Sequence, residues 1–188
     1  MYRIKIFVCI MISCCIGIIV VACGASAEAQ PAVEEVFVQD GEFCCAELSW
    51  GMSPDEAQDV MDLTPFLEGS EVQGNSDSER SYYTPKDTVV NATFFGSNYQ
   101  VKPLYEFESG GLKNVSYTFS NLSEIDSDGF LDSISKSFGE YEQKLIDVPS
   151  GDKLCQYNWI CGTTKCTYSV TYTEEQVIAV SLNVMRMS

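Results

Sequence analysis

Carboxylates and cysteines are the side chains of this sequence with the greatest capacity for chemistry, and imidazole is absent. The chain has 27 Asp and Glu residues, nine cysteines and no histidine. Histidine is the usual base at neutral pH, the partner of Ser and Cys nucleophiles and the commonest metal ligand. Its absence excludes Ser-His-Asp and Cys-His hydrolases and zinc sites that use histidine ligands.

The enzymatic chemistry that remains is that of two carboxylates. A glycoside hydrolase of this kind holds one carboxyl group protonated, with a second carboxylate about 5 to 10 Å away. Trp50 and Trp159 are the side chains against which the protonated group would be buried. The sequence singles out no such pair, so we assign no catalytic residue and expect a non-catalytic protein. A carboxylate-dependent hydrolase of cell-wall glycans is one alternative.

Five cysteines follow residue 43, namely Cys44, Cys45, Cys155, Cys161 and Cys166. A hairpin with residues 162–165 as its loop places Cys161 opposite Cys166, and opposed cysteines can reach bonding distance. In an oxidising compartment we expect a Cys161–Cys166 disulfide, with Cys155 bonded to Cys44 or Cys45. Buried free thiols and a cysteine metal site are the other interpretations. Because the spacing lacks the C-x-x-C pairs that zinc prefers, we predict no metal site and no cofactor.

The same hairpin sorts the C-terminal residues by face, because side chains alternate along a strand. The apolar face has the predicted opposite pairs Trp159 with Tyr168, Tyr157 with Val170, and Cys155 with Tyr172. The other face takes the hydroxyl residues Thr167, Ser169, Thr171 and Thr173. A last strand is expected to pair Ile178 with Tyr172, Val180 with Val170, Leu182 with Tyr168, and Val184 with Cys166.

A second hairpin is predicted over residues 101–119, with residues 109–111 as its turn. Its opposite pairs are Tyr105 with Val115, Pro103 with Tyr117, and Val101 with Phe119. Proline has no N–H group, so Pro103 requires an edge position or a bulge.

Aromatic residues of these strands are candidates for an interaction face: Tyr105, Tyr117, Tyr157, Trp159 and Tyr168. Tyrosine supplies a large contact area at a low cost in side-chain entropy. The alternative is that these residues are strand formers that pack against neighbours or in the core.

A first helix is predicted to begin at Ser53. Ser53 is placed to cap it, Pro54 occupies the first turn, and Glu56 can bond back to the cap. The apolar face of this helix consists of Ala57, Val60 and Met61, and Thr64-Pro65 is expected to end it.

A second helix is predicted over residues 124–139, with Gly139 as its C-terminal cap. Its apolar side chains are Phe130, Leu131, Ile134 and Phe138. Residues 124–129 resemble part of a calcium-binding loop, but Ser135 occupies the position where a bidentate Glu is needed. We therefore favour a turn in which an Asp or Ser caps the helix.

The first 22 residues have the pattern of an export leader. Arg3 and Lys5 precede residues 6–22, which carry no charged side chain. The sequence Val20-Val21-Ala22-Cys23 resembles the lipobox of bacterial lipoproteins, which implies that Cys23 is the lipid-attachment residue and that two acyl chains anchor it to the membrane. Two alternatives stay open: cleavage after Ala27, which would give a secreted protein, or a single N-terminal transmembrane anchor.

Composition divides the chain into a leader (1–22), a tether (23–43) and one domain (44–188). Residues 36–38 are either part of the tether or a first edge strand. The formal net charge is −16, and a chain this acidic is repelled by phosphate backbones, so no nucleic-acid partner is expected. The acidity favours cations as ligands or keeps an exported protein soluble.

The stretch Trp50-Gly51-Met52-Ser53-Pro54-Asp55-Glu56-Ala57 resembles the opening of small bacterial envelope proteins. Members include the small lipoprotein of the outer-membrane assembly machine and the β-lactamase inhibitory protein. The resemblance implies helices packed on an antiparallel sheet and a role in binding another protein. We therefore expect a two-layer α+β domain, in which about two helices pack on one face of an antiparallel sheet of about six strands.

The expected function is that of a non-catalytic, membrane-tethered extracytoplasmic lipoprotein that binds an envelope protein through an open sheet face. The membrane contact is the lipid anchor. Besides the hydrolase, a lipoprotein that binds a small ligand or a cation is the remaining alternative.

Overall fold

The computed structural model describes residues 34–46, 48–67, 79–122, 125–174 and 176–187. The chain separates into two compact units, Met1–Pro31 and Ala32–Ser188, and the fold described below is that of the second unit. The predicted leader, the lipid-attachment residue Cys23 and the first part of the predicted tether lie outside the described residues.

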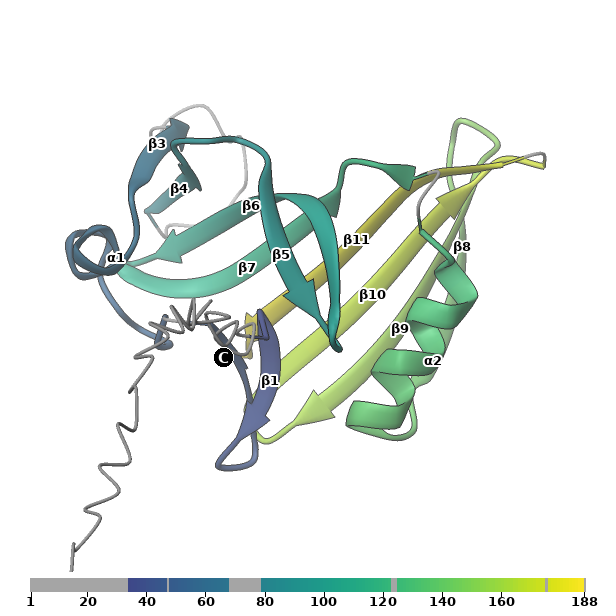
Figure 1. Cartoon of the computed structure of the whole chain (residues 1–188), viewed down its shortest axis with the longest axis horizontal. Coiled ribbons are helices and arrows are strands. Elements are labelled where there is room, and N and C mark those ends of the chain that lie inside the picture. The colour runs from purple at the N-terminus through teal and green to yellow at the C-terminus, as the bar shows by residue number, and fades with distance from the viewer. Residues whose placement is uncertain (1–33, 47, 68–78, 123–124, 175, 188) are drawn as a thin grey trace, which may run out of the picture. The chain divides into compact units, whose positions relative to one another are not determined.

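The described residues form eleven strands and two helices (Figure 1). The strands are β1 (Val36–Gln39), β2 (Glu42–Cys45), β3 (Leu63–Leu67), β4 (Arg80–Pro85), β5 (Val90–Phe94), β6 (Ser97–Glu108), β7 (Gly111–Phe119), β8 (Glu142–Asp147), β9 (Lys153–Cys161), β10 (Thr164–Tyr172) and β11 (Val177–Arg186). The helices are α1 (Pro54–Val60) and α2 (Ser127–Phe138).

One nine-stranded antiparallel sheet dominates the unit. Its strand order is β3-β4-β6-β7-β11-β10-β9-β8, with β5 also paired to β6, and β1 and β2 form a separate two-stranded sheet. The expected fold class is therefore wrong: the described residues are mostly β, not a two-layer α+β domain with about six strands.

The additional strands are those whose sequences lack a clear alternation of apolar and polar residues. In β8 every side chain except Ile146 is exposed, so this edge strand has no apolar face. In β3, Pro65 was predicted to end a helix. In the structure Leu63 already pairs with Pro85 of β4, so this segment is a strand. The strands β1 and β2 lie within or next to the predicted tether, and β1 covers the segment for which an edge strand was the alternative.

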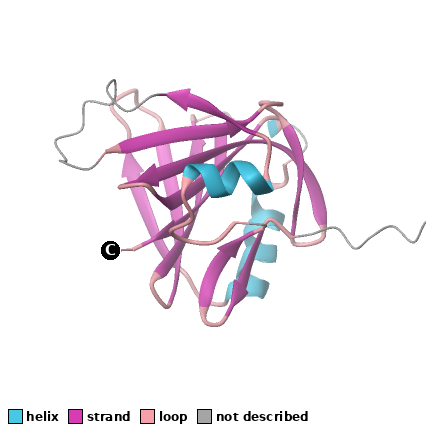
Figure 2. Cartoon of the chain, turned by 90° about the vertical axis from the view of Figure 1, so that its left-hand side faces the viewer, coloured by secondary structure: helices cyan, strands magenta, loops and turns pink. Residues whose placement is uncertain are grey.

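One face of the sheet is covered by α2 and by the β1–β2 hairpin, which lie on the same side of β9, β10 and β11 (Figure 1; Figure 2). Phe130 of α2 is 2 % exposed and Ile134 is fully buried. The Phe130 ring contacts those of Phe119 and Tyr168 at centroid distances of 5.1 and 5.2 Å. The core of the unit is thus a layer of aromatic rings between α2 and the sheet.

The predicted register of the β6–β7 hairpin is confirmed. Val101 pairs with Phe119, Pro103 with Tyr117, and Tyr105 with Val115. The turn is shorter than predicted, because Ser109 and Gly110 alone close it, with φ values of 52° and 81°. A bulge between Glu106 and Phe107 restores the register, since Phe107 pairs with Leu112.

Pro103 lies where the outer edge of β6 changes partners. Val101 is the last residue of β6 that pairs with β5, and Tyr105 is the first that pairs with β4. In this gap Thr84 Oγ1 donates a hydrogen bond to the Pro103 carbonyl (3.1 Å). The edge position expected for this proline is therefore present locally, inside a wide sheet.

The predicted register of the β9–β10 hairpin is wrong by two residues. Cys161 pairs with Thr164 across a turn made by Gly162 and Thr163, so Cys166 lies opposite Trp159. A shift of two residues keeps every side chain on its face, which is why the predicted faces are correct although the pairs are not.

The pairing of β10 with β11 agrees with the prediction over three pairs: Cys166 with Val184, Tyr168 with Leu182, and Val170 with Val180. A bulge after Thr171 changes the fourth pair, so that Tyr172 meets Val177 and not Ile178.

The first helix begins at its predicted cap, Ser53, whereas the second begins at Ser127, three residues later than predicted. Ser53 and Glu56 form a capping box at α1, in which the Glu56 carboxylate accepts from the Ser53 N–H at 2.8 Å. Of the predicted apolar face only Ala57 is buried, whereas Val60 is 45 % exposed. The helix ends at Val60, before Thr64-Pro65.

The N-terminal cap of α2 is Asp126, which accepts a hydrogen bond from the Gly129 N–H (3.1 Å). A Cβ atom at position 129 would lie 2.5 Å from Asp126 Oδ2, so glycine leaves room for the capping carboxylate. The helix ends at Gly139, whose φ of 85° suits a glycine cap. The cap interpretation of residues 125–129 is confirmed.

Candidate functional site

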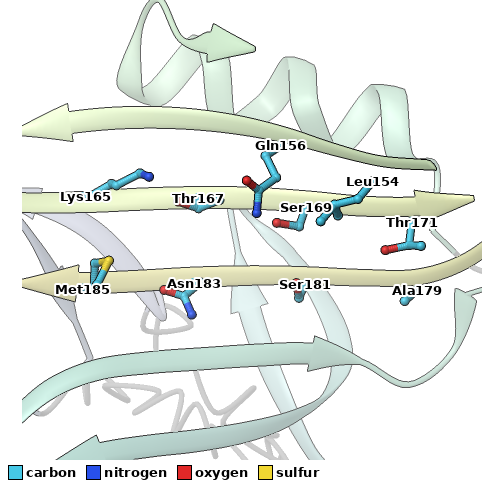
Figure 3. A pocket seen from close by; sticks show the side chains of 10 residues that line it. All are labelled: Leu154, Gln156, Lys165, Thr167, Ser169, Thr171, Ala179, Ser181, Asn183 and Met185. Atoms are coloured by element: carbon cyan, nitrogen blue, oxygen red, sulfur yellow. The ribbon is translucent and has the colours of Figure 1, made fainter. Parts of the chain in front are cut away.

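The face of β9, β10 and β11 that points away from α2 is the candidate site. Alternate residues of these strands form a shallow groove of about 460 Å³ (Figure 3). Its lining residues are Leu154, Gln156, Lys165, Thr167, Ser169, Thr171, Ala179, Ser181, Asn183 and Met185.

Small residues in the centre and long residues around them produce the groove. Ser169 lies opposite both Gln156 and Ser181 in the register. Figure 3 shows Lys165, Thr167, Ser169 and Thr171 in one row along β10, beside Asn183, Ser181 and Ala179 on β11. The floor is therefore short hydroxyl and methyl groups, and the rim is longer side chains.

Several polar groups of this groove have no hydrogen-bond partner among the residues that the structure describes. The side chains of Ser169, Ser181 and Asn183 make no hydrogen bond with any other described residue. Thr167, by contrast, donates from Oγ1 to Asn158 Oδ1 at 3.0 Å and is 9 % exposed. The centre of the groove thus offers donors and acceptors to a ligand.

The charge of the groove differs from that of the whole chain. Although the sequence has 27 acidic residues, none of the ten lining residues is acidic, and Lys165 is the one charged side chain among them. Lys165 has no ion-pair partner among the described residues. The groove is therefore a neutral to weakly cationic area on an acidic protein.

Next to the groove, an ion-pair network neutralises the acidic end of the same face. Arg80 lies 3.4 Å from Glu106 and 3.1 Å from Glu108. Hydrogen bonding to Glu108, followed by the charge of Glu106, raises the pKa of the Arg80 guanidinium above its ordinary value. Asn114, which lies opposite Met185, donates to Glu106 at 3.1 Å.

The predicted aromatic interaction face is wrong for four of its five residues. Tyr105, Tyr117, Trp159 and Tyr168 are each 2 % exposed or less and belong to the hydrophobic core. Tyr157 is partly buried, and its ring contacts those of Tyr141 and Tyr168. These rings occupy the side of the sheet that α2 covers, and the hydroxyl residues between them occupy the open side.

Two of the aromatic residues position α2. Tyr168 donates from its hydroxyl to the Ser127 carbonyl at the start of the helix (3.2 Å). Trp159 donates from Nε1 to the Gly139 carbonyl at the end of the helix (3.0 Å). Burial raises the pKa of the Tyr168 phenol well above its ordinary value, so this hydroxyl stays protonated and able to donate.

The five cysteines of the described residues are free thiols in the structure. The predicted Cys161–Cys166 opposition fails because the β9–β10 turn is shorter than expected. Cys155 lies between Val170 and Leu145 and accepts a hydrogen bond from Gln143 Nε2 (3.2 Å). Cys44 and Cys45 belong to β2, so the register of the large sheet does not place Cys155 opposite either of them.

The carboxylate arrangement of the hydrolase alternative is not present around either tryptophan. No described Asp or Glu is buried. Trp50 donates from Nε1 to the Phe43 carbonyl and lines a second hollow of about 650 Å³, where Asp40 is exposed and Glu42 is partly exposed. The rings nearest to Trp159 are those of Phe138 and Tyr141.

Two further features concern the described part of the chain alone. No group of three or more Cys, Asp or Glu residues within it has the geometry to hold a metal ion. Neither α1 nor α2 has the length and apolar composition that a helix needs to cross a bilayer.

The hydroxyl side of the site was detectable in the sequence, since Thr167, Ser169 and Thr171 were predicted to share a face. The contribution of β11 was not predicted. Ser181 and Asn183 alternate with apolar residues, and the predicted pairs of this strand involved only those apolar residues. No protein-family model, curated protein or solved structure matches this chain.

Proposed function

We propose that this chain is a non-catalytic extracytoplasmic binding protein whose β9–β11 groove receives a protein partner. The observation that carries the proposal is the row of hydrogen-bonding groups without a partner among the described residues, Ser169, Ser181 and Asn183, in a groove whose lining has no carboxylate. These groups lie on a rigid sheet, so a partner binds them without ordering a loop.

The chemistry of the groove specifies the partner. Hydroxyl and amide groups both donate and accept, so they match the uncharged polar side chains and exposed peptide groups of another protein surface. Lys165 at one end of the groove matches a carboxylate on that partner. Acidic surroundings discourage other acidic surfaces, so the carboxylate-free groove defines where contact is favourable.

The membrane tether is part of the same proposal. The lipobox-like sequence that ends at Cys23 supports a lipid anchor in the cell envelope, and two acyl chains give stable membrane retention. Mass spectrometry of the mature N-terminus tests this. We expect an acylated Cys23, and a mature chain that begins with unmodified Glu28 would contradict it.

Site-specific photo-crosslinking in the native cells tests the groove. A crosslinking amino acid is placed at Ser169 or Ser181 in the groove and, as a matched control, at Ser97, which is exposed at the start of β6 and does not line the groove. We expect the same protein to be crosslinked from both groove positions and not from Ser97.

A binding measurement with the identified partner completes the test. The substitution Ser181→Arg fills the groove, and we expect it to weaken binding by at least about tenfold, which corresponds to about 1.4 kcal/mol. Ser97→Arg adds the same charge and bulk elsewhere and should leave the affinity within about twofold. Equal crosslinking from all three serines, or equal affinities of the two arginine variants, would argue against the groove as the binding site.

A further inference from the structure

Strand β2 runs alongside the start of β10 with a constant offset in residue number. A Cβ atom at Gly162 would contact the Gly41 carbonyl. Thr163 Oγ1 donates to Glu42 at 2.5 Å, and the Phe43 N–H donates to Thr164 Oγ1 at 2.7 Å. Each step along residues 41–43 thus matches one step along residues 162–164, which lead into β10.

The same offset, continued by two residues, brings Cys45 to Cys166. Thr164 fixes this alignment because it is fully buried and its hydroxyl both accepts from Phe43 and donates to the Cys161 carbonyl at 2.7 Å. The partners of Thr164 are therefore all inside the protein, and β2 has no freedom to slide along β10.

The burial pattern points both thiols into the same space. Cys45 is 3 % exposed and Cys166 is fully buried, and both belong to the hydrophobic core. Cys44 points to the opposite side of β2 and is partly exposed. After burial itself, the neighbouring Cys166 is the largest cause that raises the pKa of Cys45, which is consistent with adjacent thiols.

We propose that Cys45 and Cys166 form a disulfide that fastens the β1–β2 hairpin to the large sheet. In this reaction both S–H bonds break and one S–S bond forms. The two electrons and two protons pass to a small-molecule disulfide, which is reduced to two thiols. The proposal rests on the alignment of β2 with β10 and does not depend on what the groove binds.

Packing of the hairpin aligns the two thiols and also buries them. Thiolates are the reactive species in disulfide exchange, and burial raises the pKa of both Cys45 and Cys166 in the folded protein. Oxidation of the folded, reduced chain is therefore slow, whereas oxidation during refolding is fast.

Peptide mapping of the full chain tests the proposal. The reduced chain is refolded in detergent solution with a mixture of oxidised and reduced glutathione, free thiols are alkylated, and the digest is analysed by tandem mass spectrometry without reduction. We expect one linked peptide pair that joins Cys45 to Cys166. The same pair should persist in Cys44→Ser, which is the matched control next to the proposed site, and in Cys161→Ser.

Three results would overturn the proposal. They are alkylation of both Cys45 and Cys166 in the wild-type chain, a bond that tandem spectra place at Cys44, or a bond from Cys45 to a cysteine other than Cys166. Since the wild-type chain alone distinguishes these results, the test stands even where a cysteine variant does not fold.

Discussion

The two faces of β10 differ in what their residues do, although the residues alternate along one strand. Tyr168 is fully buried, and its ring contacts that of Phe130 in α2. Its hydroxyl donates a hydrogen bond to the carbonyl of Ser127, the first residue of that helix. Ser169, its neighbour, lies in the groove and makes no side-chain hydrogen bond within the described part of the chain. The buried face therefore sets the stability of the fold, and the open face contributes little to it.

This division also separates large side chains from small ones. The buried face of β9, β10 and β11 is aromatic and branched, because it must fill the space beneath α2. Six of the ten residues that line the groove on the open face are Ser, Thr, Asn or Gln, which do not fill a core. A sheet that only had to fold would not require a groove without carboxylates in a chain of net charge −16.

The largest expected difference between the two faces is measured at the adjacent residues Tyr168 and Ser169. We expect Tyr168→Ala to lower the free energy of unfolding by about 3 to 5 kcal/mol, because it removes a buried ring and a hydrogen bond to α2. Ser169→Ala should change it by less than about 0.5 kcal/mol. Urea denaturation of both variants measures the difference. Similar losses would mean that the two faces are not energetically distinct.

Reduction of the proposed Cys45–Cys166 bond gives the next largest effect. The bond closes a loop of more than 100 residues, so its loss should lower the free energy of unfolding by about 2 to 5 kcal/mol. Unfolding of the oxidised chain with and without a reductant measures this, and Cys44→Ser should show the same dependence on the reductant. A stability that is unaffected by reductant would contradict the expectation.

Alkaline titration distinguishes the reduced from the oxidised protein in another way. Burial raises the pKa of Cys45 and Cys166 above the ordinary value of 9.0. A raised pKa means that stability is complete below the ordinary value and is lost as the pH rises toward the folded-state value. The reduced chain should therefore begin to lose stability near pH 9. The oxidised chain lacks these two thiols and should lose less stability in this range, where burial also raises the pKa of the remaining Cys44 thiol.

Periodicity in the sequence predicts which residues share a face but not which face is covered. Trp159 and Tyr168 were correctly predicted to share one face of the sheet, but that face was predicted to be a binding surface. Which face is covered depends on where α2 packs, and the sequence of the strands does not specify this. The same limit explains the β9–β10 register, because a turn of two or of four residues leaves the faces of Cys161 and Cys166 unchanged.

Helix caps and strand pairs were predictable where the residue types favour one local structure. The Ser53–Glu56 capping box, the Gly139 cap and the three β6–β7 pairs are present as predicted. Strands such as β8 were not predictable, since a strand exposed on both faces carries no apolar period. The proximity of Cys45 to Cys166 could not be predicted from the sequence either, because it depends on a contact between two separate sheets.

Loss of a single anchor between the buried face and α2 should have an intermediate effect. Trp159→Phe keeps a ring in the core but removes the hydrogen bond from Nε1 to the Gly139 carbonyl. We expect a loss of about 1 to 2 kcal/mol in the free energy of unfolding. Hydrogen exchange should localise the change to the last turn of α2, whereas an equal change at both ends of the helix would point to a general loosening of the core.

The smallest effect is expected for Thr167, which belongs to the open face although it is nearly buried. Thr167→Val keeps the shape of the side chain and removes the hydroxyl that donates to Asn158. The net contribution of one hydrogen bond is about 0.5 to 1.5 kcal/mol, and the added methyl group offsets part of its loss. We therefore expect a decrease below about 1 kcal/mol by urea denaturation, since Asn158 remains accessible to water. A loss comparable to that of Tyr168→Ala would show that the open face also supports the fold, and the division between the two faces would then be invalid.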